Sequence, residues 1–240
     1  ARLYLPQKDF SNVVPKFLDV GCASGFFMKG LQDASKWDCY GVEINSELAE
    51  YARDKLHLKI HTGTLDDAPF EKGSFDYIYL RDIVEHVTNP LEFLVSCQQL
   101  LKPDGKIYLS IPNGYIDSIG LIEFYQKNQS KSRSPNGHLY FFNKSSLLFL
   151  LSKAGLKTEL SGTYGVKYGL RVLRYLPRKE KWIRSYDPRE TWGDSGGFVT
   201  LNKTERPALY HVLKMMINRW LMLRGLVKIG LDFELILSRK

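Results

Sequence analysis

The chain has 240 residues, 44% of them hydrophobic, a composition typical of a globular protein and not of a disordered one. This length allows one large domain with a sizeable core. The net charge of +8 favours acidic partners, such as phosphorylated molecules, nucleic acid or an anionic membrane surface. From these residues we expect neither a signal peptide nor an apolar run long enough to span a bilayer.

The three cysteines, Cys22, Cys39 and Cys97, fall in or beside predicted strands and helices. We therefore expect buried thiols without disulfides, and a cytoplasmic location. The absence of a C-x-x-C pair argues against a zinc site.

Residues 17–43 have the pattern of a strand, a tight turn, a helix and a second strand. The apolar run 17–20 ends at Gly21, and Gly25 closes the turn before a helix over 25–34. Small residues between the two glycines would let backbone N–H groups approach a ligand. The second strand, 39–42, ends in Glu43, where a carboxylate can hold a ribose diol. The pattern predicts a nucleoside site.

A dinucleotide fingerprint would need glycines at positions 21, 23 and 26. The chain has Ala23 and Phe26 at the last two, so NAD is the weaker alternative. The other alternative is a βα turn with glycines at its ends that binds no ligand.

The same stretch resembles motif I of the class I S-adenosylmethionine (SAM) methyltransferases, acidic-x-Gly-x-Gly-x-Gly, through Asp19, Gly21, Ala23 and Gly25. Three further phrases, FDYIYLRDIVEHV, LLKPDGKIYLSIPN and GHLYFFNKSSLLFLLSKAGLK, are similar to a subgroup of this family. That subgroup contains ubiquinone-pathway O-methyltransferases and bacterial sugar and cell-envelope methyltransferases. The resemblance covers residues 17 to about 163. It implies an α/β fold with a Rossmann-like, doubly wound, mostly parallel seven-stranded sheet and an antiparallel last strand.

The resemblance also implies SAM as cofactor and S-adenosylhomocysteine as its product. The loop backbone would lie against the methionine part of SAM, Glu43 would take the ribose hydroxyls, and Thr64 and Leu65 would lie at the adenine. Many relatives have Asp where this chain has Thr64, and Asp66 or Asp67 would substitute for it. The implied cofactor site comprises Asp19, Gly21, Cys22, Ala23, Gly25, Glu43, Ile44, Thr64, Leu65, Asp66 and Arg81.

The remaining pattern alternates strands with helices, as in a doubly wound sheet. We predict helices over 46–55, 90–101, 145–154 and 207–225. We predict strands over 58–61, 75–80, 106–111, 157–161 and 231–237, with a turn at 103–105.

Two histidines are candidates for a general base. His86 follows the fourth strand at its carboxyl end, and His138 follows a polar segment. An unperturbed pKa of about 6.5 suits proton removal near neutrality. The alternative is that each imidazole only bonds a loop backbone. Asp82, Glu85 and His86 have a spacing that would let a helical turn hold a divalent cation, but we expect no metal.

Acceptor recognition is predicted in two segments outside the nucleotide core. We expect 115–137 to be a mobile lid, with a plain surface loop as the alternative. Residues 164–205, rich in aromatic and basic side chains, would form a substrate cap or a loosely packed cover. The predicted organisation is a SAM-binding core over 1–163, this insertion, and a terminal helix and strand over 206–240.

These features predict O-methylation of a sugar-containing or other small hydroxylated metabolite. The acceptor would be a small molecule, with a glycan or phosphorylated compound as candidates and nucleic acid less favoured. The alternatives are an RNA or protein methyltransferase, and a non-catalytic SAM-binding scaffold. The apolar helix over 207–225 suggests burial against the core or a homodimer partner, with peripheral membrane contact as the alternative.

Overall fold

The computed structural model describes residues 14–35, 37–128, 137–164 and 232–240. The strands are β1 (Lys16–Val20), β2 (Asp38–Glu43), β3 (Lys59–Thr62), β4 (Phe75–Arg81), β5 (Leu101–Pro112), β6 (Leu156–Tyr164) and β7 (Asp232–Arg239). The helices are α1 (Phe26–Ala34), α2 (Ser46–Asp54), α3 (Pro90–Leu100), α4 (Gly114–Asn128) and α5 (Lys144–Lys153). The predicted insertion beyond residue 164 and the predicted helix 207–225 lie outside the described residues.

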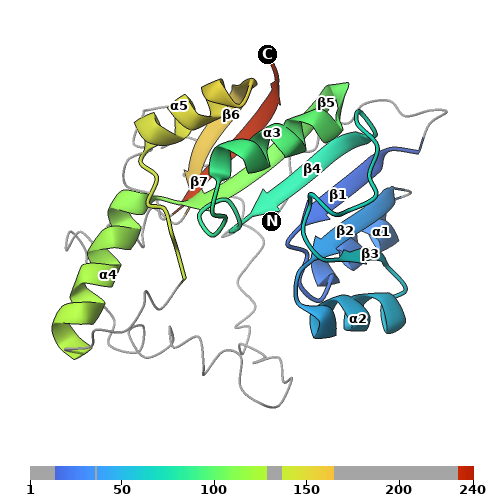
Figure 1. The fold of residues 1–240 in the computed structure, drawn as a ribbon, viewed down its shortest axis with the longest axis horizontal. Helices are drawn as coiled ribbons and strands as arrows, with labels where there is room; N and C mark the ends of the chain where they lie inside the picture. Colours follow the sequence, from blue (N-terminus) through green and yellow to red (C-terminus); the bar gives the residue numbers. More distant parts are fainter. Residues whose placement is uncertain (1–13, 36, 129–136, 165–231) are drawn as a thin grey trace, which may run out of the picture.

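The strands form one seven-stranded sheet in the order β3-β2-β1-β4-β5-β7-β6 (Figure 1). Strands β1 to β5 pair in parallel, and β7 lies antiparallel between β5 and β6. The predicted fold class, with its antiparallel last strand, is confirmed. Strands β2 and β3 follow on one side of β1 within the sheet, and β4 and β5 follow on its other side. The strand order therefore reverses between β1 and β4.

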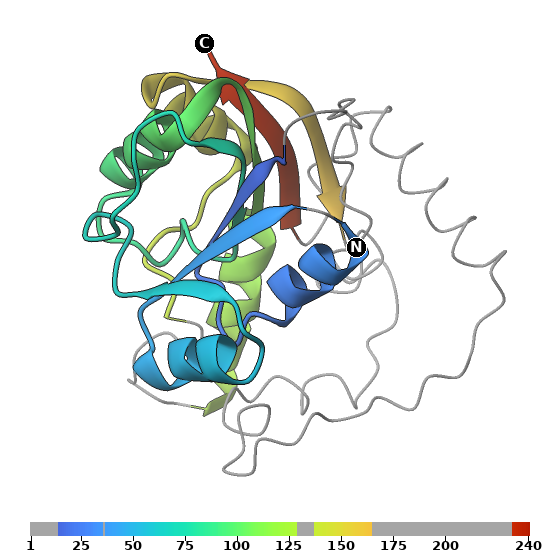
Figure 2. The ribbon, with the colours of Figure 1, turned by 90° about the vertical axis from the view of Figure 1, so that its right-hand side faces the viewer.

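Each face of the sheet has its own apolar core. In Figure 2, α1 lies on one side of the sheet, and α3 and α5 lie on the other. Met28 of α1 packs with Phe17 and Tyr77, whereas Leu94 of α3 packs with Leu18. This division follows from β1, because successive side chains of a strand point to opposite faces.

The predicted turn at 103–105 lies inside β5. Phe75 pairs with Leu101 and Tyr77 with Lys106, so one residue of β4 lies opposite residues 102–105 of β5. The extra residues form a bulge, and a bulge keeps the strand continuous while it bends.

The segment predicted as a mobile lid is helical over most of its length. α4 runs from Gly114 to Asn128, and its start is capped by Asn113, whose side-chain oxygen accepts a hydrogen bond from Tyr115 N at 3.3 Å. Ile116 is buried and anchors the first turn. The alternative of a plain surface loop was wrong for 115–128, because the cap and this apolar contact stabilise a helix there, and the role of a lid stays a prediction.

The three cysteines are buried free thiols, as predicted. Within the described ranges, none of the helices combines the length and apolar character that crossing a membrane requires.

Candidate active site

The candidate site lies where the carboxyl ends of the parallel strands meet. Asp19, Glu43 and Arg81 lie at or near the ends of β1, β2 and β4. The strand order reverses between β1 and β4, and open α/β sheets bind ligands in the crevice at such a point. The glycine loop after β1 and the 82–89 loop after β4 therefore border the same region.

Backbone geometry requires the two glycines of the loop. Gly21 and Gly25 both have φ of 75°, in the left-handed region that glycine adopts most readily. A Cβ on Gly21 would lie 2.7 Å from Cδ1 of Ile83, and one on Gly25 would lie 2.6 Å from Cδ1 of Leu58. Ile83 belongs to the 82–89 loop, so this contact holds the two loops together.

The carboxylate of Glu43 is buried and fixes the loop. Its Oε2 accepts a hydrogen bond from Ala23 N at 2.8 Å, and its Oε1 accepts one from Asn45 N at 2.8 Å. The N–H groups of Gly21 and Cys22 both donate to Val42 O. These loop N–H groups are thus used inside the protein, whereas the sequence suggested that they face a ligand. The cofactor would be recognised by the loop's shape and by the carboxylates.

Asp19 lies buried beside Glu43. Burial and the charge of Glu43 raise the pKa of Asp19 from 3.8 to about 7, although Arg81 acts in the opposite direction. Two buried carboxyl groups this close favour a cationic ligand, which would offset their repulsion. SAM carries a sulfonium and an ammonium group, so these residues fit it, with Glu43 also placed for the ribose.

The residues assigned to the adenine lie at the ends of β2 and β3. Ile44 follows Glu43 with 74% of its surface exposed, which leaves an apolar side chain free to cover a base. Leu65 is buried in the core. The Thr64 hydroxyl donates to Asp67, and Asp66 accepts a hydrogen bond from Ser96 at 3.2 Å. In this structure, Asp66 is therefore engaged with α3.

The two predicted catalytic histidines lie in contact. Their ring centroids are 4.8 Å apart and the rings meet edge to face. Nδ1 of His86 lies 3.2 Å from Gly137 O. Because a carbonyl oxygen only accepts, Nδ1 carries the hydrogen, and the lone pair of neutral His86 is on Nε2. Partial loss of water and the neighbouring His138 lower the pKa of His86.

Residues 137–142 connect the 82–89 loop to α4. Leu139 N donates to Glu85 O at 2.9 Å, and the Tyr140 hydroxyl donates to Thr88 O at 2.9 Å. On the other side, Gly114 N donates to Phe142 O at 2.8 Å. A Cβ on Gly114 would clash with the backbone of Phe141 and Phe142, so glycine permits this close approach. The 137–142 segment thereby brings His138 to His86.

Two acidic residues of this region were not recognised from the sequence as catalytic candidates. Nδ1 of His138 lies 2.7 Å from Oδ2 of Asp117, in the first turn of α4. Glu85 is 1% exposed, and neither carboxyl oxygen has a hydrogen-bond partner among the described residues. Burial raises the pKa of Glu85 to about 7. The signal for Asp117 would have been a helix start directly after β5, given by the cap Asn113 and the apolar residues of 115–125.

The alternative cation site does not form as its spacing suggested. Asp82 has φ of 51°, and residues 82–89 form turns and bends without a helix. The helical face that Asp82, Glu85 and His86 would share is therefore absent. Instead, Glu85, His86 and His138 bring a carboxylate oxygen and two imidazole nitrogens within 4.8 Å of one another. Side chains of these types hold metal ions in some proteins and move protons in others. That no metal is needed stays a prediction.

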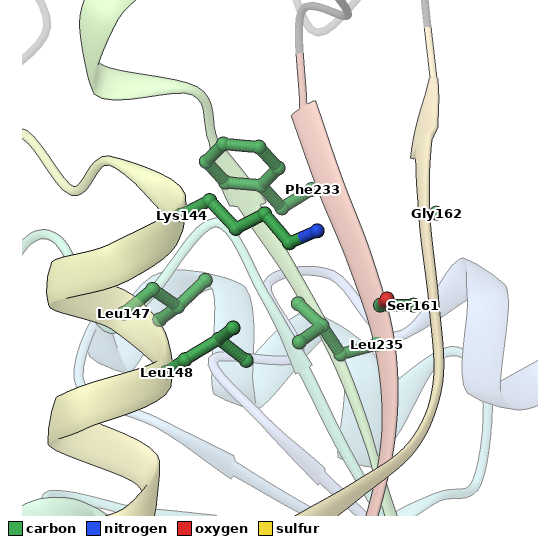
Figure 3. Close-up of a pocket in the computed structure, with 7 residues that line it drawn as sticks. All are labelled: Lys144, Leu147, Leu148, Ser161, Gly162, Phe233 and Leu235. Carbon is green, nitrogen blue, oxygen red and sulfur yellow. The ribbon is translucent and has the colours of Figure 1, made fainter. Parts of the chain in front are cut away.

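A separate hollow lies between α5 and β7. In Figure 3, Lys144, Leu147 and Leu148 of α5 lie across from Phe233 and Leu235 of β7. Ser161 and Gly162 of β6 complete the lining. The hollow contains one cation but no carboxylate or imidazole, so it offers no general base.

The sheet order and the glycine loop define the fold of a class I SAM-dependent methyltransferase. Residues 2–160 match the family model described as a methyltransferase domain, and the chain belongs to this family.

Two curated relatives of this chain are ubiquinone biosynthesis O-methyltransferases. A ubiquinone biosynthesis O-methyltransferase of Actinobacillus pleuropneumoniae is 30% identical over 129 residues, which cover 50% of this chain and 55% of that protein. One from Caulobacter vibrioides is 25% identical over 177 residues, which cover 71% of this chain and 67% of that protein. The chain thus matches little more than half of the Actinobacillus relative.

Solved structures agree on the fold. A SAM-dependent methyltransferase from Archaeoglobus fulgidus is 19% identical, with a TM-score of 0.53 over 95% of this chain and 86% of that one.

Proposed function

We propose that this protein transfers a methyl group from SAM to a hydroxyl oxygen of a small molecule. The observation that carries the proposal is the pair of histidines at the carboxyl edge of the sheet, with rings 4.8 Å apart, beside the loop that contacts Gly21 through Ile83. A hydroxyl acceptor must lose a proton as it is methylated, and imidazoles are suited to take it. The names of the two curated relatives, both O-methyltransferases, support the same chemistry.

The cofactor would be held by the loop from Gly21 to Gly25, by Glu43 and by Asp19. When bound, SAM supplies an electrophilic methyl carbon on a good leaving group. The protein's contribution is then alignment, which can lower a barrier by roughly 7–11 kcal/mol. Glu43 contributes by holding the loop in one shape through Ala23 and Asn45.

His86 is the proposed general base. It is exposed, it is neutral near pH 7 because its pKa is lowered, and its Nε2 lone pair is available. As the acceptor oxygen forms its bond to the methyl carbon, the hydroxyl proton would pass to this nitrogen. General base catalysis of this kind contributes about 100- to 10,000-fold in rate.

The acceptor would have an apolar or aromatic body. Exposed large apolar side chains occur on α4, which carries Asp117, and on the 137–142 segment, which carries His138: Tyr115, Ile122, Leu139, Tyr140 and Phe141. Such surfaces mark binding sites more often than chance. A hydroxylated ring is therefore favoured, in line with the relatives' names, and a sugar-containing acceptor is the alternative.

We further propose a cytoplasmic location, which the three free, buried thiols support. A homodimer and peripheral membrane contact stay proposals that rest on the sequence between 207 and 225.

The test uses the purified chain, radiolabelled SAM and a fractionated extract divided into small phenols, sugar conjugates, RNA and protein. We expect label in the small-phenol fraction, at least 100-fold lower with His86→Asn at unchanged SAM affinity. Label in sugar conjugates would change the acceptor class, and label only in RNA or protein would refute the proposal. SAM binding without transfer to any fraction would favour a non-catalytic binding protein.

A further inference from the structure

The two imidazoles of the histidine pair are held by different partners. His86 donates through Nδ1 to the carbonyl of Gly137, which is uncharged. His138 donates through Nδ1 to the carboxylate of Asp117 at 2.7 Å. The side chains of His138 and Asp117 are only 9% and 16% exposed, so water screens this ion pair weakly. The two histidines therefore differ in the charge of their hydrogen-bond partners.

We propose that Asp117 is a positioning residue that holds His138 in the form that donates a hydrogen bond to the acceptor oxygen. His86 is then the general base. This inference rests on the proposed O-methyl transfer. With Nδ1–H directed to Asp117, the protonated imidazole of His138 also carries Nε2–H, which would donate to the acceptor oxygen. The hydroxyl proton goes to Nε2 of His86, the oxygen–carbon bond forms as the carbon–sulfur bond breaks, and His138 keeps both of its protons.

The placement of Asp117 follows from the start of α4. Asn113 caps the helix, and Asp117 N donates to Asn113 O at 3.0 Å in the first helical bond. Gly114 N donates to Phe142 O, which ties this turn to the 137–142 segment. The carboxylate is thereby set against His138 by backbone contacts on both segments. A simple role in the helix dipole would not require this alignment.

The surrounding charges support the same assignment. Burial alone would lower the pKa of His138, but the hydrogen bond and charge of Asp117, with the charges of Glu85 and Asp82, raise it. The charges of Asp82 and Asp117 act on His86 as well, but loss of water and the neighbouring His138 lower its pKa. These shifts have the directions that the geometric assignment needs, because the pKa of His138 is raised and that of His86 is lowered.

The first test needs no turnover. In the full-length chain labelled with ¹⁵N in its imidazoles, we expect the NMR signals of His138 to report a protonated Nδ1 and a pKa above that of His86. Asp117→Asn should lower the pKa of His138. A neutral His138 with a bare Nδ1, or an unchanged pKa in the variant, would overturn the proposal.

The second test measures kinetics with radiolabelled SAM and 3,4-dihydroxybenzoate as the probe acceptor. For Asp117→Asn we expect kcat to fall about 100-fold and the alkaline limb of the pH profile to move to lower pH, with SAM affinity unchanged. Ser118→Ala in the same helical turn is the control and should keep the activity. A lower melting temperature with unchanged kcat would reduce Asp117 to a structural role.

The two proposals fail differently. If the unmodified protein methylates none of the hydroxyl acceptors, the proposed function fails, whatever the NMR shows. If it methylates them and Asp117→Asn has the same kcat and pH profile, only the role of Asp117 fails.

Discussion

Oε2 of Glu43 accepts a hydrogen bond from the backbone N–H of Ala23 at 2.8 Å, across 20 residues of sequence. This contact joins the tip of β2 to the glycine loop after β1. A charged acceptor makes the bond stronger than one between neutral groups, and its removal leaves a partly buried N–H without this partner.

Replacing Glu43 should therefore affect both stability and cofactor binding. For Glu43→Gln we expect a loss of about 1.5–3 kcal/mol in the free energy of unfolding and at least tenfold weaker SAM binding. Denaturant titration and calorimetry measure the two effects. Glu50→Gln, on the exposed face of α2, should change neither. Full SAM affinity in Glu43→Gln would exclude this carboxylate from the site.

A methyl group at position 21 should damage the loop. Its φ of 75° is strained for alanine, and the added carbon would lie 2.7 Å from Cδ1 of Ile83. We expect Gly21→Ala to lower the melting temperature and to abolish measurable SAM binding. Gly30→Ala is a matched control, because a Cβ there meets nothing within 4 Å. In a helix, that change should stabilise by about 0.5–1 kcal/mol.

Asp19 should make stability depend on pH. Its pKa in the fold, about 7, lies above the ordinary value of 3.8, so its favourable contribution is complete below pH 3.8 and is lost as pH rises through 7. Above pH 7, Asp19→Asn should be more stable than the unmodified chain and should bind SAM more weakly. Thermal melts across this range test the sign. If Asp19→Asn were less stable than the unmodified chain above pH 7, burial and the charge of Glu43 would not explain the behaviour of Asp19.

Chelation tests the expectation that no metal is required. Methyl transfer should be unchanged after dialysis against EDTA, and Mg²⁺ or Zn²⁺ should not raise the melting temperature. If a divalent ion restored activity that EDTA had removed, Glu85, His86 and His138 would be the residues to replace first, because their donor atoms converge within 4.8 Å.

Much of the nucleotide-binding half could be predicted from local pattern. The apolar run before Gly21 and the second strand ending in Glu43 are short-range signals, and the structure places both as expected, whereas the helix expected from Ser46 has its cap one residue earlier, at Asn45. They are predictable because backbone conformation and burial at these positions depend on neighbouring residues.

The acceptor side was harder to predict. The expectation for 115–137 was a lid or a surface loop because residues 126–137 are polar, whereas the apolar residues of 115–125 form α4 with Ile116 buried. The contact between Asp117 and His138 spans 21 residues and depends on how two loops meet. No local pattern encodes such a contact. The bulge in β5 was missed for a similar reason, because only pairing with β4 keeps 101–112 in one strand.

The most direct test of the central claim is the identity of the bond that the protein makes. With SAM labelled by ¹³C in its methyl group, the purified chain and the small-phenol fraction, NMR of the product distinguishes a methoxy carbon from an N-methyl or C-methyl carbon. We predict a methoxy signal that disappears with His86→Asn. An N-methyl or C-methyl signal, or a methoxy signal that survives that change undiminished, would contradict the account.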